Sequence, residues 1–175
     1  CFLQHHGFAL EHEEWTMTLD KLPAATFTPP TRPGQLRRMD RAAAVRTLPA
    51  LYERCFAPTA WFQPYSAAEV SATWQPGDEL WTLVADGATI GFAWLHRPTP
   101  HAAEVEPIGI VPEKQGMGYG RTLLTTLLQQ LKNQGMQTVS LGVWQQNETA
   151  VHLYHSLGFR HVSSSYSLTC PLNPT

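Results

Sequence analysis

The stretch that decides the fold is Val111-Pro112-Glu113-Lys114-Gln115-Gly116-Met117-Gly118-Tyr119-Gly120-Arg121, which runs directly into Thr122-Leu123-Leu124-Thr125-Thr126-Leu127-Leu128. Glycines at alternate positions open a strongly amphipathic helix, and an apolar strand precedes them. Such an opening presents backbone N–H groups at the positive end of the helix dipole, where anions bind. A phosphate can approach this backbone closely because glycine has no side chain. The sequence therefore predicts a ligand that carries phosphate.

Two common phosphate-binding loops do not fit this stretch. A Walker loop needs Lys and then Ser or Thr after its last glycine, but Gly120 is followed by Arg121 and Thr122. A dinucleotide-binding loop has the spacing G-x-G-x-x-G, and the spacing here is G-x-G-x-G. A tight strand-to-helix turn without a ligand is the remaining alternative, and the rest of the chain has to decide.

Length and composition predict one compact domain with a real core, since 43% of the 175 residues are hydrophobic and 15% are charged. The net charge of −2 favours no nucleic-acid partner, and no apolar run is long enough for a membrane span. Cys1, Cys55 and Cys170 lack metal-ligand spacing, so we expect free thiols, a reducing cytoplasmic location and no metal.

Turn and capping signals divide the chain into strands and helices. Asp40 and Ser66 are predicted helix N-caps, the second in a capping box with Glu69, and Pro49 is expected to kink or divide the first helix. Asp86-Gly87 is typical of a hairpin turn. The expected strands are 36–39, 80–85, 88–95, 102–110, 138–143 and one or two from 159 onward, and the expected helices start at 41, 66, about 120 and about 148.

This order, with the residues at its junctions, resembles the GNAT superfamily of acyl-CoA-dependent N-acyltransferases over roughly residues 35–172. Three signatures carry the likeness: Ile110-Val111-Pro112-Glu113 followed by Gln115-x-x-Gly118-x-Gly120, then Asn147-x-x-Ala150-x-x-Leu153-Tyr154, then Leu157-Gly158-Phe159. The resemblance implies a GNAT fold of the α/β (α+β) class. Its central sheet would be mostly antiparallel, with helices at its flanks and a splayed parallel pair formed by strands 102–110 and 138–143.

The resemblance also implies acetyl-CoA as cosubstrate. Backbone amides of the loop would bind its pyrophosphate, and these residues are Gln115, Gly116, Met117, Gly118, Tyr119, Gly120 and Arg121. The backbone of Ile108 and Ile110 would hydrogen-bond the pantetheine arm in the manner of a missing neighbour strand. Asn147 would bond the same arm from the other side, and its alternative role is a plain helix N-cap.

Catalytic roles follow from the same likeness. Tyr154 corresponds to the family's usual general acid, which protonates the coenzyme A thiolate, and the alternative is that its ring only packs. Glu106, with Glu104 second, is the candidate base, because alternate residues of a strand share one face and Glu106 lies nearer the thioester. The alternative is that both are solvated carboxylates and that positioning with ordered water suffices.

We therefore expect an N-acetyltransferase that transfers an acetyl group directly, in a ternary complex, to a primary amine of a small molecule. The alternatives are a protein or peptide N-acetyltransferase and a non-catalytic acyl-CoA sensor or scaffold. Trp61, Phe62 and Tyr65 fall where the family's acceptor pocket lies, and core packing explains them equally well.

The two ends of the chain resemble each other. Phe2–Phe8 aligns without a gap with Leu153–Phe159, and Trp15–Leu19 then falls on Tyr166–Cys170. We interpret residues 1–22 as the tail strands of a preceding GNAT-like domain, residues 23–34 as a Pro-rich linker and residues 35–175 as the acetyltransferase domain. The tail is expected to pack on this domain's sheet, or on a neighbouring molecule in a homodimer or with that preceding domain.

Overall fold

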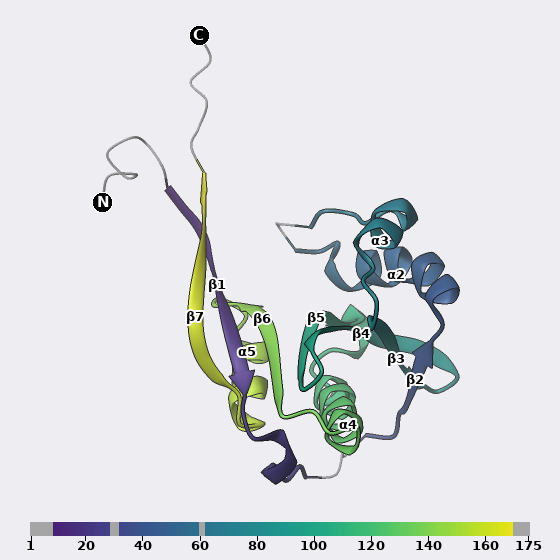
Figure 1. Ribbon diagram of the computed structural model, residues 1–175. Helices are drawn as coiled ribbons and strands as arrows, with labels where there is room; N and C mark the ends of the chain where they lie inside the picture. The colour runs from purple at the N-terminus through teal and green to yellow at the C-terminus, as the bar shows by residue number, and fades with distance from the viewer. Residues whose placement is uncertain (1–8, 29–31, 60–61, 170–175) are drawn as a thin grey trace. The chain divides into compact units, whose positions relative to one another are not determined.

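The computed structural model describes residues 9–28, 32–59 and 62–169. These residues form two compact units (Figure 1). The larger unit comprises residues 20–139, and the smaller unit combines residues up to 19 with those from 140 onward. Each unit is described by itself below.

The larger unit is built on antiparallel strands in the order β2 (Gln35–Met39), β3 (Glu79–Ala85), β4 (Ala88–Thr99) and β5 (Ala102–Ile110). The predicted hairpin is confirmed, because Asp86 (φ 52°) and Gly87 (φ 76°) adopt the left-handed backbone of a two-residue turn between β3 and β4. Strand β6 (Thr138–Trp144) starts beside β5, with the N–H groups of Gln137 and Thr138 donating to the carbonyl oxygen of His101 at 2.8 and 3.3 Å.

The helices of the larger unit are α2 (Arg41–Phe56), α3 (Ala67–Thr73) and α4 (Tyr119–Asn133), with short 3-10 turns η1 (Leu22–Ala24) and η2 (Pro112–Lys114). Both predicted caps are confirmed: Asp40 accepts from the N–H of Ala43, and Ser66 forms the reciprocal capping box. The prediction that Pro49 divides the first helix is wrong, because α2 continues through it. Leu48 and Leu51 lie on either side of Pro49, and the burial of their side chains stabilises the helix at this position.

The core of the larger unit joins α2 and α4 to the sheet. Leu123, Leu124, Leu127, Leu128 and Leu131 are fully buried along one face of α4, as their helical spacing predicts. Gly135 (φ 80°) ends this helix in the left-handed region.

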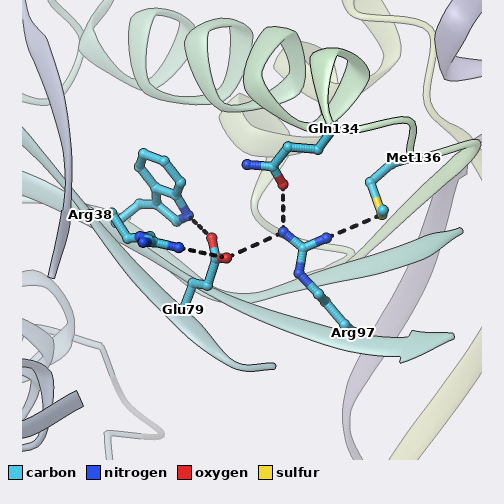
Figure 2. A network of polar contacts seen from close by, with 6 residues as sticks. Arg38, Glu79, Arg97, Gln134 and Met136 are labelled. Atoms are coloured by element: carbon cyan, nitrogen blue, oxygen red, sulfur yellow. Dashed lines mark hydrogen bonds and ion pairs between the residues drawn. The ribbon is translucent and has the colours of Figure 1, made fainter. Parts of the chain in front are cut away.

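A polar network fixes the end of α4 to the sheet (Figure 2). One carboxylate oxygen of Glu79 on β3 lies 3.3 Å from both Arg38 and Arg97, and the other accepts from the indole of Trp81 at 2.9 Å. Arg97 on β4 reaches on to the side-chain oxygen of Gln134 at 2.5 Å and to the sulfur of Met136 at 3.4 Å. The C-terminal end of α4 is thereby fixed against the strands of its own unit.

The smaller unit contains strands in the order β6-β1-β7, with β1 (Ala9–Leu19) antiparallel to β7 (Arg160–Thr169), and the helix α5 (Glu148–Ser156). Residues 9–19, interpreted above as part of a tail, therefore lie between β6 and β7 as a strand of this unit. The part of the chain-end alignment that falls on residues 1–8 lies outside the described residues. The α/β class and the order of elements from residue 35 onward are confirmed.

Candidate active site

The glycine-rich loop enters α4 without any side-chain cap. Gly118 is the N-cap, with φ 87° and ψ 0°, and Gly116 also has a positive φ of 69°. The first turn contains no acidic residue. The N–H groups of Tyr119, Gly120 and Arg121 precede the first i to i−4 hydrogen bond, which runs from Thr122 to Gly118. This helix start has the geometry and polarity of an anion site.

Side chains hold the loop in place. Gln115 donates from its amide nitrogen to the carbonyl oxygen of Ile110 at 2.8 Å, which ties the loop to the end of β5. Arg32 donates through Nε to the carbonyl oxygen of Met117 at 3.0 Å, and its own carbonyl accepts from the Thr122 hydroxyl at 3.3 Å. The segment interpreted as a linker is thus fastened to the loop, a contact that no sequence pattern indicated.

At the end of β5, the backbone groups of alternate residues point away from β4. The N–H of Val111 donates to the carbonyl of Ile90 on the β4 side at 2.9 Å. Because successive residues of a strand point their polar groups to opposite edges, those of Ile110 and Ile108 point away from β4. The bond from Gln115 to the Ile110 carbonyl agrees with this direction.

The two candidate bases have different surroundings. Glu104 lies opposite His96 in the β4–β5 pairing. The pairing then shifts from Leu95–Val105 to Ala93–Ile108, so β5 has one residue more than β4 in the bulge that contains Glu106. The regular alternation behind the expected common face of Glu104 and Glu106 is therefore interrupted.

The charge of Glu106 acts on an aromatic cluster formed by residues on and after α2. Burial raises the pKa of Tyr52, and the hydroxyl of Tyr65 and the charge of Glu106 add to the effect. The Tyr52 ring lies 4.8 Å from Phe56, 5.8 Å from Phe62 and 4.7 Å from Tyr65, measured between centroids. All four rings are half-buried, so they pack together and also present aromatic surface. Trp61, the third member of the group singled out in the sequence, lies outside the described residues.

The close approach of α2 to β5 depends on one glycine. A Cβ at Gly109 would lie 3.0 Å from Cβ of Cys55 and 3.1 Å from the Phe56 ring. A side chain at this position would push α2 away from the strand. The aromatic cluster therefore stands beside the strand segment that holds Glu106 because residue 109 has no side chain.

The remaining two predicted residues lie on α5 in the smaller unit. Asn147 is the N-cap, its side-chain oxygen accepting from the N–H of Ala150 at 3.2 Å, which leaves the amide nitrogen as its donor group. Tyr154 is buried, and its ring centroid lies 6.0 Å from that of Phe159. The N-cap and packing roles named as alternatives are thus both observed, and neither excludes the role toward a ligand.

Two kinds of structural feature are absent from the residues that the structure describes. Residues 9–28, 32–59 and 62–169 contain no cluster of three or more His, Cys, Asp or Glu side chains arranged to hold a metal ion. Within the same ranges, no helix combines the length and apolarity needed to cross a bilayer.

A glycine-capped helix that starts just after a strand end with outward-facing backbone groups is the arrangement expected of an acyl-CoA-dependent transferase domain. Comparison with known proteins gives the family. Residues 45–159 match the acetyltransferase (GNAT) family model, and the chain belongs to that family.

Curated relatives are named mycothiol acetyltransferase. The protein from Paenarthrobacter aurescens (strain TC1) is 42% identical over 89 residues, which is 48% of this chain and 28% of that protein. The protein from Sanguibacter keddieii is 25% identical over 97% of this chain and 59% of its own length. The chain thus spans less than two thirds of the length of these relatives.

Solved structures share the fold. The ribosomal-protein-S18-alanine N-acetyltransferase from Escherichia coli has a TM-score of 0.64 at 24% identity, covering 75% of this chain and 80% of that one. A GNAT family acetyltransferase from Elizabethkingia anophelis with acetyl-CoA bound has a TM-score of 0.59 at 17% identity, covering 74% and 78%.

Proposed function

We propose that this chain carries the acetyl-transfer site of an enzyme that moves an acetyl group from acetyl-CoA to a primary amine of a small molecule, and that the acceptor is an amine related to mycothiol. The observation that carries the proposal is the uncapped start of α4 at Gly118, joined to the end of β5 by the Gln115–Ile110 hydrogen bond. The names of the curated relatives supply the acceptor class.

Cosubstrate binding uses backbone groups. The loop from Gln115 to Arg121 offers N–H donors to the pyrophosphate, and charge-assisted bonds of this kind are about twice as strong as neutral ones. Ile108 and Ile110 offer strand-like hydrogen bonds to the pantetheine amides, and the Asn147 amide nitrogen offers one more. The half-buried aromatic rings near Glu106 provide a surface for the body of the acceptor.

The transfer proceeds by direct attack. Glu106 takes a proton from the acceptor ammonium, and the neutral nitrogen attacks the thioester carbonyl. The tetrahedral intermediate loses the coenzyme A thiolate, which Tyr154 protonates, and the nitrogen gives up its second proton to the tyrosinate, directly or through water, while Glu106 releases its proton to solvent. Glu104 is the second candidate for the base. The remaining contribution is positioning of the two substrates.

Thiol release from acetyl-CoA, measured against a panel of amines that includes mycothiol-related amines, tests the proposal. Turnover with a small amine supports it. Acetyl-CoA binding without turnover of any amine would instead support a sensor or scaffold, and turnover only with peptides would support a protein acetyltransferase.

Substitution of the proposed base tests the mechanism. Glu106→Gln should lower kcat/KM by roughly 10²-fold below about pH 8, where the acceptor is mostly ammonium, and by less above it. Glu53→Gln on the exposed side of α2 is the matched control and should leave the profile unchanged. If Glu106→Gln is as active as the parent at low pH while Glu104→Gln is not, the base is Glu104.

A further inference from the structure

His96 connects two elements of the larger unit through both of its ring nitrogens. Its Nδ1 lies 3.0 Å from a carboxylate oxygen of Asp78, and its Nε2 lies 3.1 Å from the backbone carbonyl oxygen of Glu106. The antiparallel pairing explains this placement. Glu79 pairs with Leu95, so Asp78 falls beside His96 on one side, and Glu104 pairs with His96 on the other.

Asp78 is a buried carboxylate, and only one of its two oxygens receives hydrogen bonds from groups other than His96. Its side chain is 1% exposed, and its Oδ2 accepts from the backbone N–H of Gln75 at 2.9 Å and from the indole of Trp94 at 3.2 Å. Its Oδ1 has no hydrogen-bond partner among the described residues besides the His96 ring. A buried carboxylate oxygen left unpaired is costly, so the 3.0 Å approach of the His96 ring is the contact that compensates it.

The other side of the ring faces a backbone carbonyl. A carbonyl only accepts, so the contact with Glu106 requires a proton on Nε2. The side chain of Asp78 lies on the Nδ1 side of the ring, and Glu104 pairs with His96 across the β4–β5 ladder. Trp94 covers the ring, with centroids 4.9 Å apart, and is itself stacked on Trp74 at 5.5 Å.

The carbonyl that His96 holds belongs to the bulge of β5. Pro107 follows Glu106 and has no N–H, and the ladder to β4 is interrupted between Val105 and Ile108. His96 thus replaces, with a side chain, the backbone pairing that the bulge removes. The backbone from which the Glu106 side chain projects is consequently fixed by a hydrogen bond from His96.

We propose that His96, held by Asp78, is a positioning residue that fixes the Glu106–Pro107 peptide and so sets the direction of the Glu106 carboxylate in the acetyl-transfer site. The proposal rests on the proposed function for the role of Glu106. Because the glycine-rich loop is held by other residues, loss of His96 should affect kcat and leave the KM for acetyl-CoA nearly unchanged. Misplacement of a reacting group by about 1 Å costs up to about 100-fold, so we expect kcat to fall between about 10- and 100-fold.

The first test is spectroscopic and does not depend on turnover. Nitrogen-15 spectra of the histidine-labelled protein should show a proton on Nε2 of His96, because this nitrogen donates to the Glu106 carbonyl. Asp78→Asn replaces the carboxylate that faces Nδ1, so the His96 ring signals should shift in that variant. A wild-type signal of an unprotonated Nε2 for His96 would overturn the proposal.

The second test reads the carbonyl itself. Carbon-detected correlation of the Glu106 carbonyl with the Pro107 nitrogen reports this hydrogen bond directly, and the signal should shift in His96→Gln and stay in place in His101→Gln, an exposed histidine on the same hairpin. An unchanged signal in His96→Gln refutes the proposal. If His96→Gln does not fold, the wild-type and Asp78→Asn spectra still decide it.

Kinetics then link the contact to the reaction. His96→Gln should lower kcat with an altered acid limb of the pH profile, and His101→Gln should match the parent enzyme. Normal kcat in a folded His96→Gln variant with a shifted carbonyl signal would refute the positioning role. Full activity of Glu106→Gln is a different outcome, because it refutes the base assigned in the proposed function.

Discussion

Gly118 allows the sharpest test of the anion site, because an added methyl group acts on stability and on ligand binding through separate causes. At φ 87° and ψ 0°, alanine must adopt a left-handed backbone, which costs about 1–2 kcal/mol. For a domain of this size, that corresponds to a Tm lower by roughly 2–8 °C without ligand. Gly135 at the other end of α4 has nearly the same φ of 80°, and a Cβ there meets nothing within 4 Å. Gly135→Ala is therefore a control with similar strain and no part in the loop.

Ligand binding separates the two variants. Acetyl-CoA at about 100 times its Kd stabilises the parent protein by about 2.7 kcal/mol. If the Gly118 methyl group removes one hydrogen bond to a charged phosphate, binding weakens by about 1.5–3 kcal/mol. The same acetyl-CoA concentration then stabilises Gly118→Ala by only about 0.3–1.3 kcal/mol.

Differential scanning fluorimetry with and without acetyl-CoA measures both effects. Gly118→Ala should lose at least half of the ligand-induced rise in Tm, and Gly135→Ala should keep all of it. An undiminished rise in Gly118→Ala would refute the reasoning that the backbone at this helix start binds the phosphate. An equal loss in Gly135→Ala would mean that helix strain, and not the loop, weakens binding.

Two further predictions concern residues near the loop and in the core. Arg32→Ala removes the hydrogen bond to the Met117 carbonyl and should raise the KM for acetyl-CoA several-fold with kcat unchanged. The control Arg37→Ala loses only an exposed contact with Gln35 and should leave this KM unchanged. Equal KM values for both variants would contradict a role of Arg32 in holding the loop. Burial raises the pKa of the Cys55 thiol to about 12, so mass-spectrometric mapping after iodoacetamide at about pH 8 should find Cys55 unmodified in the folded protein and modified in urea. Because the pKa of Cys55 is raised on folding, the contribution of the buried neutral thiol to the free energy of unfolding is fully present below the pKa of the unfolded chain and is lost as pH rises toward about 12. Modification of native Cys55 at about pH 8 would show that the thiol is not buried as described.

Local patterns predicted the elements well because each signal acts within a few residues. Asp40 and Ser66 cap their helices with the expected hydrogen bonds, and Asp86-Gly87 forms the expected turn. Pro49 does not divide its helix, because the buried side chains on either side of it outweigh the hydrogen bond that proline removes. The rule for proline in a helix gives the free-energy cost at one residue and does not include the packing of the whole helix.

The site could be predicted only where a motif covers it. The start of α4 follows from its glycines, but the bulge at Glu106–Pro107 depends on how two strands pair, and strict alternation misses it. Tyr52 lies four residues before Phe56, a spacing that indicates a shared helix face. The contact between Asp78 and His96 follows from the hairpin register once the Asp86-Gly87 turn is placed, since each lies near the far end of its strand. The attachment of Arg32 to the loop has no such local signal.

The role of Gln115 illustrates why a motif residue need not touch the ligand through its side chain. Its amide nitrogen is used on the Ile110 carbonyl, at the end of β5 where the backbone points away from β4. That bond joins the strand expected to hold the pantetheine arm to the loop expected to hold the pyrophosphate. Because both parts are in place before acetyl-CoA arrives, less ordering is required on binding. We therefore expect Gln115 to contribute to affinity by fixing the distance between two backbone surfaces. A residue unable to donate at this position should weaken binding of the whole cosubstrate more than that of its isolated phosphate end.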